Sequence, residues 1–153
     1  MSLESEINQS SFVSEQSKVL VNLIYTYNVV KGRISDILRE EGLTMQQYNV
    51  LRIVLGSGDT GITTSEIRNR MLDKMCDASR MVDRLASSGL VEKNRDKLDR
   101  RMVMIHLTEQ GQLLTKRLMS EKRIDQLVSA FDEKSAQLLN QQLDALRALV
   151  TAP

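Results

Sequence analysis

The chain has 153 residues, of which 41% are hydrophobic, 27% charged and only 3% aromatic, and its formal net charge is +1. This balance is that of a folded globular protein and excludes a disordered one. A single cysteine excludes an intrachain disulfide and a cysteine-cluster metal site, and the lack of an apolar run of about 18 residues excludes a membrane-spanning helix. We expect a cytoplasmic protein without a metal ion or another cofactor.

The first third of the chain carries two helical patterns. Apolar residues recur every three or four positions from residue 12 to residue 38, which predicts one long amphipathic helix. Gly42 fits a C-terminal stop of that helix. Residues 44–47 (Thr-Met-Gln-Gln) match a capping box, which predicts the start of a second helix, and the glycines of residues 56–61 (GSGDTG) are expected to end it.

Two shorter helices are predicted next. Residues 63–66 (Thr-Thr-Ser-Glu) match a second capping box and begin a helix that is expected to end near Met71. Asp73 is the expected N-cap of the following helix, at about residues 74–87. The predicted buried face of that helix consists of Met75, Ala78, Met81, Val82 and Leu85.

A charged hairpin and two more helices complete the chain. Two short strands are predicted at residues 90–95 and 101–107, around the charged turn. The second strand is expected to be anchored by Val103, Ile105 and Leu107, which share one face. Thr108 caps a helix predicted to reach about Ala130, and Asp132 caps the last one.

Positive charge gathers in the middle of the chain. Residues 67–101 hold ten basic and six acidic residues, a net charge of +4, against +1 for the whole chain. A basic centre between acidic flanks is expected of a module that binds a polyanion, although charge clusters are also common on solvated surfaces.

The predicted order of elements is that of a winged helix-turn-helix. In this fold the helix after the turn lies in the DNA major groove, and the hairpin, or wing, extends beside it. Burying the apolar face of residues 74–87 turns Arg80 outward near the middle of the helix. A guanidinium group in that position can make a bidentate contact with guanine.

Three segments carry a family resemblance: MVDRLASSGLVEK at residues 81–93, DKLDRR at 96–101 and IHLTEQG at 105–111. They resemble the MarR/SlyA family of bacterial winged-helix regulators, over about residues 43–114. The resemblance implies a mainly α fold with a small β-hairpin wing and long dimerisation helices at both ends. It also implies a transcriptional regulator, a repressor relieved by a small effector or another signal.

The same resemblance organises the whole chain, residues 1–153, as a single domain. Residues 1–40 and 108–153 would interlock with a second copy to form a homodimer, and residues 44–107 would bind DNA. Each subunit would place its recognition helix in the major groove and its wing, about residues 93–102, in the minor groove. The implied partner is a palindromic double-stranded DNA site.

Individual DNA-binding residues follow from the motif positions. Arg101 occupies the position of the family's wing-tip arginine, Asp99 that of the aspartate that helps to orient it, and Arg80 that of an arginine used for base contact in some members. Location and charge assign phosphate contacts to Lys97 and Arg100. The full predicted set is Lys74, Cys76, Asp77, Arg80, Arg84, Lys97, Asp99, Arg100 and Arg101.

The chain departs from the family at residues 73–79 (DKMCDAS), where many members have small polar residues. Asp77 in that position would repel phosphate or accept a hydrogen bond from a cytosine amino group. Arg80 could instead pair with Asp77 or Asp83, and the wing arginines with the wing's own aspartates. Exposed pairs of this kind contribute only about 0–1 kcal/mol. Cys76 is either a thiol activated near a helix N-terminus or, as we favour, a passive small residue.

Other functions have weaker support. Tyr25, Tyr27 and Tyr48 either line a crevice for a phenolic effector or simply pack between the two regions. A winged-helix module that binds protein rather than DNA would keep the dimer and lose salt-dependent duplex binding. An enzyme is least supported, because the sequence has no nucleophile–base set, phosphate loop or metal-ligand cluster around its one histidine, His106.

Overall fold

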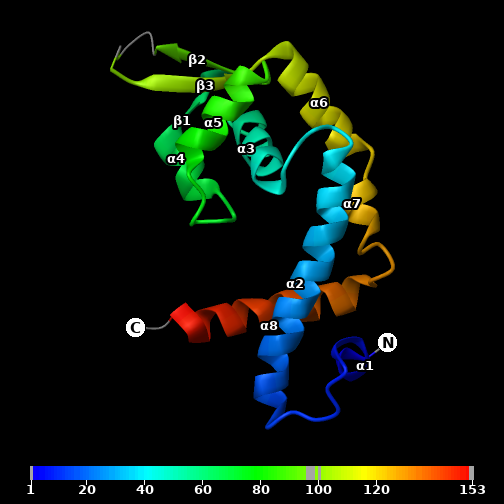
Figure 1. The fold of residues 1–153 in the computed structure, drawn as a ribbon. Helices are drawn as coiled ribbons and strands as arrows, with labels where there is room; N and C mark the ends of the chain where they lie inside the picture. The colour runs from blue at the N-terminus through cyan, green and yellow to red at the C-terminus, as the bar shows by residue number, and fades with distance from the viewer. Residues whose placement is uncertain (1, 96–98, 100, 152–153) are drawn as a thin grey trace. The chain divides into compact units, whose positions relative to one another are not determined.

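The computed structural model describes residues 2–95, 99 and 101–151. It divides into two compact units, Met1–Ser120 and Glu121–Pro153. The larger unit contains the winged helix together with the long N-terminal helix, and the smaller one contains the C-terminal helices (Figure 1). No helix among the described residues is long and apolar enough to cross a membrane.

The predicted long helix is confirmed as α2 (Glu15–Arg39). Ser14 begins it, because its hydroxyl accepts the backbone N–H of Ser17 at 3.1 Å while the Ser17 side chain accepts that of Ser14. A short helix, α1 (Leu3–Ile7), precedes it and is tied to it by a hydrogen bond from the Tyr25 hydroxyl to the Glu6 carboxylate at 2.8 Å. Gly42 adopts a φ of +67° just after the end of α2, as expected of a helix stop.

Both predicted capping boxes are present. Helix α3 (Met45–Leu55) begins at Thr44, whose hydroxyl accepts the Gln47 N–H, and the Gln47 side chain accepts the N–H of Thr44. Helix α4 (Thr64–Arg70) begins at Thr63 with Glu66 in the same reciprocal arrangement. These local hydrogen bonds fix the two helix starts without reference to the rest of the chain.

The wing belongs to a three-stranded antiparallel sheet of order β1-β3-β2. The two predicted strands are β2 (Val91–Arg95) and β3 (Val103–Leu107). A third strand, β1 (Ile62–Thr63), pairs with the far edge of β3 after a 3-10 turn at Gly58–Thr60. Ile105 is the fully buried anchor of β3, whereas Val103 is 44% exposed and Leu107 half-buried, so the predicted anchoring face is correct only at its centre.

Helix α6 (Glu109–Ser120) is shorter than predicted. Leu118 is its last buried side chain, and Lys122 then adopts a left-handed φ of 52°, which an α-helix cannot continue through. The chain resumes as α7 (Arg123–Gln126) and α8 (Glu133–Thr151). Asp132 caps α8 as predicted, because its carboxylate accepts the Ser135 N–H at 3.1 Å.

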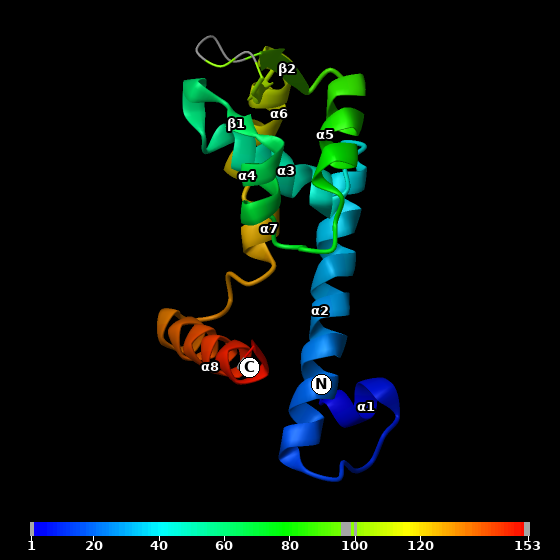
Figure 2. The ribbon, with the colours of Figure 1, turned by 90° about the vertical axis from the view of Figure 1, so that its left-hand side faces the viewer.

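The core of the larger unit lies where α3, α4, α5 (Ala78–Ser87) and the sheet meet (Figure 2). Each of these elements, together with the C-terminal end of α2, contributes side chains that are almost completely removed from water. The largest are Leu38, Val50, Leu51, Ile62, Ile67, Met71, Val82, Leu85 and Ile105. The predicted mainly α fold with a small β-hairpin wing is therefore confirmed.

Candidate nucleic-acid interface

The recognition helix, α5, begins at Ala78 rather than near residue 74. Its N-cap is Asp77, whose carboxylate accepts the backbone N–H of Arg80 at 3.1 Å. Asp73, the predicted cap, instead accepts the N–H of Met75 at 3.0 Å within the preceding turn. Both aspartates can bond a nearby backbone N–H, and the one that starts the helix is the one followed by the buried residues Ala78 and Val82.

This later start moves three predicted DNA-binding residues off the helix. Lys74 and Cys76 lie in the turn between α4 and α5, and Asp77 lies at its end. Met75, which was predicted to be buried, is 95% exposed, so that prediction was wrong. Cys76 is half-buried. The open turn that carries these residues is visible in Figure 2.

Arg80 lies on the exposed face of α5, as predicted. Its side chain is 79% exposed, and its Nε lies 3.4 Å from the second carboxylate oxygen of Asp77. Asp77 therefore accepts a hydrogen bond from the backbone of Arg80 and also pairs with its side chain. The Arg80–Asp77 pair, which the sequence analysis gave as an alternative to DNA contact, is thus present. Since exposed pairs at this spacing are weak, the guanidinium remains available to another acceptor. Arg84 is also exposed, one helical turn further on.

The recognition helix is joined to the wing by an ion pair. The Lys93 ammonium group on β2 binds the carboxylate of Asp83 on α5. Asp83 is thus occupied by Lys93, so the wing strand and the recognition helix are connected by side chains as well as by the backbone between them.

The described part of the wing tip is organised by Asp99. Its carboxylate accepts the backbone N–H of Arg101, and its carbonyl oxygen accepts that of Met102, both at 2.9 Å. Asp99 thereby fixes the backbone from which the exposed Arg101 side chain projects. Lys97 and Arg100, the other predicted contacts of the wing, lie outside the described residues.

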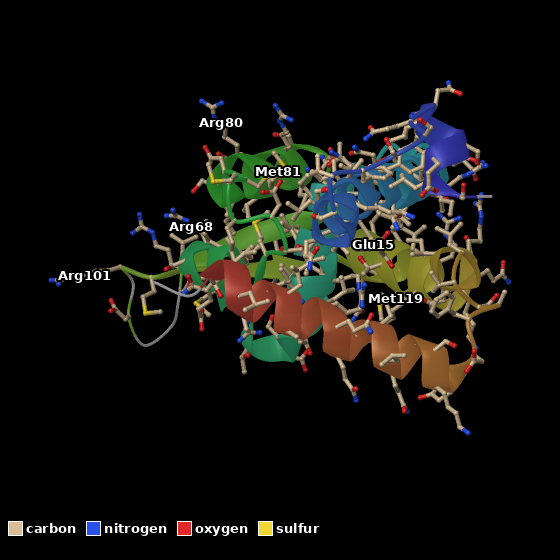
Figure 3. All side chains as sticks on the ribbon, turned by 90° about the horizontal axis from the view of Figure 1, so that it is seen from below. Glu15, Arg68, Arg80, Met81, Arg101 and Met119 are labelled. Carbon is tan, nitrogen blue, oxygen red and sulfur yellow. The ribbon has the colours of Figure 1, made fainter. Side chains whose placement is uncertain are left out.

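Arg68 on α4 is a cation that the sequence analysis did not single out. It lines a groove of about 600 Å³ between α4 and the following turn, together with Thr64, Ser65, Lys74, Cys76 and Ser79. Figure 3 shows Arg68, Arg80 and Arg101 projecting from the same side of the larger unit. The sequence did offer one indication of this position. The capping box locates the start of α4, and Arg68 falls in the last turn of that helix.

The base of the wing is built on the LTEQG motif. The Thr108 hydroxyl donates to the Gly89 carbonyl at 2.6 Å and accepts the Gly111 N–H at 3.0 Å. A Cβ at Gly111 would lie 1.9 Å from the carbonyl oxygen of Leu90, which is far inside contact distance. The motif thus requires a hydroxyl and a bare glycine, because α6 starts directly against the backbone that leads into β2.

The three tyrosines have different surroundings. Tyr25 donates to Glu6 on α1, and this hydrogen bond raises the pKa of the phenol. Tyr48 is buried on α3, with the Arg52 guanidinium 5.8 Å from the centre of its ring. Tyr27 lines a pocket of about 370 Å³, whose other sides are Lys31, Met45, Gln46, Asn49, Met71, Leu72, Asp73 and Lys74.

A metal-binding cluster is not formed by the part of the chain that the structure describes. Within it, no three His, Cys, Asp or Glu side chains are placed to share an ion. His106 lies on β3, where its ring covers Gly61 and leaves no room for a Cβ at that glycine. The observed position of His106 is therefore one of packing.

Comparison with known proteins places this geometry in a family. The sequence model described as transcriptional regulator SarA/Rot matches residues 33–118. The uncharacterized HTH-type transcriptional regulator YsmB of Bacillus subtilis (strain 168) is 26% identical over 95 residues, which are 62% of this chain. The match spans 64% of YsmB, which is less than two thirds of its length.

Solved structures share the fold at low sequence identity. CouR from Rhodococcus jostii RHA1, bound to p-coumaroyl-CoA, has a TM-score of 0.71 and 23% identity, covering 93% of this chain and 98% of its own. A putative MarR-like regulator from Bacillus cereus ATCC 10987 has a TM-score of 0.74 and 15% identity, covering 90% and 99%. The resemblance to MarR-type winged-helix regulators that the sequence predicted is confirmed.

Proposed function

Because the chain belongs to the SarA/Rot family of transcriptional regulators, which are not enzymes, we propose that it regulates transcription by binding a palindromic double-stranded DNA site as a homodimer. The observation that carries this proposal is the set of exposed cations on one side of the winged helix. Arg68, Arg80 and Arg101 come from three different elements and lie exposed at the same end of the larger unit (Figure 3). A duplex, which presents phosphates and base edges side by side, is the partner that engages all three elements.

In this proposal the recognition helix enters the major groove and the wing enters the minor groove. Arg80 contacts a base edge, with guanine the matching acceptor for its guanidinium, and Arg101 enters the minor groove. Lys74, Arg84, Lys97 and Arg100 contact phosphates. Asp77 and Asp99 position the arginines at the DNA, since their carboxylates accept the backbone N–H groups of Arg80 and Arg101.

The homodimer is supported by two helices whose apolar residues are not covered within their own units. Among the described residues of α8, no side chain is buried. On α2 a row of large apolar side chains remains exposed, comprising Val19, Leu20, Leu23, Ile24, Tyr27 and Val30. We therefore assign residues 1–40 and 108–153 to dimerisation and residues 44–107 to DNA binding, within one functional domain.

The protein is further proposed to be a repressor released by a small effector. CouR carries p-coumaroyl-CoA in its structure, and the pocket beside Tyr27 is the corresponding candidate in this chain. Lys31 places its ammonium group 5.7 Å from the centre of the Tyr27 ring, and residues 71–74, which lead towards α5, form the opposite wall. A ligand in this pocket would act on the turn that positions the recognition helix.

Selection of duplexes from a random pool, followed by titration at several salt concentrations, tests the proposal. We expect enrichment of a palindrome and a logarithm of affinity that falls linearly with the logarithm of salt concentration, by about 0.9 for each phosphate contacted. Analytical ultracentrifugation should show a dimer at the same protein concentrations. A dimer that enriches no duplex would instead identify a winged-helix module that binds protein.

A further inference from the structure

The turn between α4 and α5 presents apolar side chains to solvent, although hydrogen bonds fix its backbone. Leu72 is 84% exposed and Met75 is 95% exposed. The backbone N–H of Leu72 donates to the Asn49 side chain on α3 at 3.0 Å, and that of Met75 donates to the Asp73 carboxylate at 3.0 Å. The exposure of these side chains is therefore set by a hydrogen-bonded backbone.

The two exposed side chains face different surroundings. Leu72 lines the pocket beside Tyr27. Met75 lines the groove between α4 and the turn, whose walls carry the Arg68 guanidinium and the Lys74 ammonium group. Lys74 is positioned there by donating to the Asn69 carbonyl at 2.6 Å. Met75 is thus an apolar tip beside the cations Arg68 and Lys74, and the two nearby carboxylates, Asp73 and Asp77, each accept a backbone N–H.

An apolar tip beside two cations whose neighbouring carboxylates are held by backbone N–H groups matches a surface that is both polyanionic and locally apolar. The major groove of DNA is such a surface, because thymine places its C5-methyl group there between two phosphate backbones. In helix-turn-helix proteins the residues at the N-terminal end of the recognition helix contact base edges. Met75 lies two residues before the N-cap of α5, and a flexible thioether adapts to a methyl group at low cost.

We infer that Met75 is a specificity-determining residue, which contacts the C5-methyl group of a thymine in the major groove near the base contacted by Arg80. This inference rests on the proposed DNA binding and adds a base preference to it. Arg80 supplies the polar part of recognition and Met75 the apolar part. The Ser and Thr hydroxyls and the cations of the groove beside Met75 suit the sugar-phosphate backbone of the same strand.

Replacement of thymine by deoxyuridine isolates the proposed contact, because it removes the C5-methyl group and leaves base pairing unchanged. In a duplex selected by the wild-type protein, each thymine of one half-site is replaced in turn. We expect one position at which the replacement weakens wild-type binding about fourfold, the effect of returning one methyl group to water. The variant Met75→Ala should bind thymine and deoxyuridine duplexes equally at that position, whereas Met75→Leu should retain most of the difference.

Met119→Ala provides a matched control, since Met119 is 45% exposed on α6, away from Arg80 and Arg101 (Figure 3). This variant should keep the full sensitivity to deoxyuridine, because any effect on dimerisation would weaken binding to thymine and deoxyuridine duplexes equally. If Met75→Ala keeps it as well, or if no thymine position is sensitive, the inference fails while salt-dependent duplex binding still supports the proposed function. If no duplex is enriched, both fail. If Met75→Ala changes self-association and not the affinity for DNA, Met75 is a protein contact and the inference fails.

Discussion

The winged-helix core and the long helices contain similar apolar residues. In the core these residues are buried by the same chain, whereas along the long helices many of them are exposed. Leu51, Ile67 and Leu85 in the core are completely buried, whereas Leu20 and Ile24 on α2 are 52% and 62% exposed. The difference separates two tasks. The core is complete as a single-chain structure, and the long helices present apolar surface of the kind that an interface between copies removes from water.

The largest expected effect is on the stability of the core. Leu85→Ala should lower the free energy of unfolding by about 2–5 kcal/mol, because it leaves a cavity among close-packed side chains. Leu72→Ala, the same substitution at a position that is 84% exposed, should change it by less than about 0.5 kcal/mol. Urea denaturation followed by circular dichroism measures both values, and equal losses would remove the distinction between covered and uncovered residues.

The next effect is on dimerisation. Leu20 and Ile24 lie one helical turn apart on α2, and replacing both by Ala should weaken the proposed dimer by about 2 kcal/mol, or about thirtyfold in dissociation constant, because the buried apolar area falls. Sedimentation equilibrium measures this change. Leu72→Ala, at an exposed position outside the residues assigned to dimerisation, should leave the dimer unchanged. A dimer unaffected by the α2 substitutions would have to use another surface.

A smaller effect is expected on the DNA-binding face, without any change in stability or dimerisation. Arg101→Ala should weaken binding to all sequences and reduce the salt slope by about 1. Arg80→Ala should cost about 1–3 kcal/mol at the cognate site and relax the base preference there.

Arg147→Ala is the matched control for the Arg80 substitution. Arg147 pairs with Asp144 three residues away on α8 and is 67% exposed, as Arg80 pairs with Asp77 on α5. Once sedimentation equilibrium has shown that the Arg147→Ala dimer is intact, fluorescence anisotropy should therefore find wild-type affinity for this variant. Equal losses for the two variants would show that general charge, and not the position of Arg80, controls binding.

The smallest effect concerns the contact between α1 and α2. Lys18 on α2 lies 2.5 Å from the Glu4 carboxylate and lowers the pKa of that group from 4.5 to about 2. Since the pKa is depressed in the folded state, the stabilisation is present above pH 4.5 and lost as the pH falls towards about 2. The protection factors of the α1 amides, which correct for the pH dependence of intrinsic exchange, should fall over this range in the wild type. Glu4→Gln should show the lower protection already at neutral pH.

Local hydrogen-bonding patterns were the most predictable part of the fold. The capping boxes at Thr44 and Thr63 depend on side chains three residues apart, so the sequence alone located both helix starts. The LTEQG motif was predictable for a similar reason, although its glycine is required by a contact with Leu90 that only the folded chain contains. Strand β1 has two residues and leaves too short a pattern to detect.

The exposure of the arginines in the candidate site could be predicted from the sequence, but the conformation of the turn between α4 and α5 could not. Arg80 and Arg101 are exposed as their motif positions indicated. Asp73 and Asp77 are equally good caps locally, and packing of Ala78 and Val82 against the core decides between them. That choice turned Met75 from an expected core residue into an exposed one. Tyr25 and Tyr27 lie two residues apart on α2, so helix geometry alone turns them to different faces, whereas the burial of Tyr48 on α3 depends on tertiary packing.

The contact between Gly111 and the Leu90 carbonyl has a consequence for how DNA spacing is set. Backbone meets backbone there, so no side-chain rotamer can absorb a tilt of α6 relative to the hairpin. In the proposed dimer the separation of the two wings is therefore a property of the helices that join the subunits. Half-sites of helix-turn-helix dimers lie about 34–36 Å apart or at multiples of that distance. The preferred length of the spacer between half-sites thus depends on the geometry of the dimer. A signal that changes the packing of the dimerisation helices would be detected first as a change in the preferred spacer length.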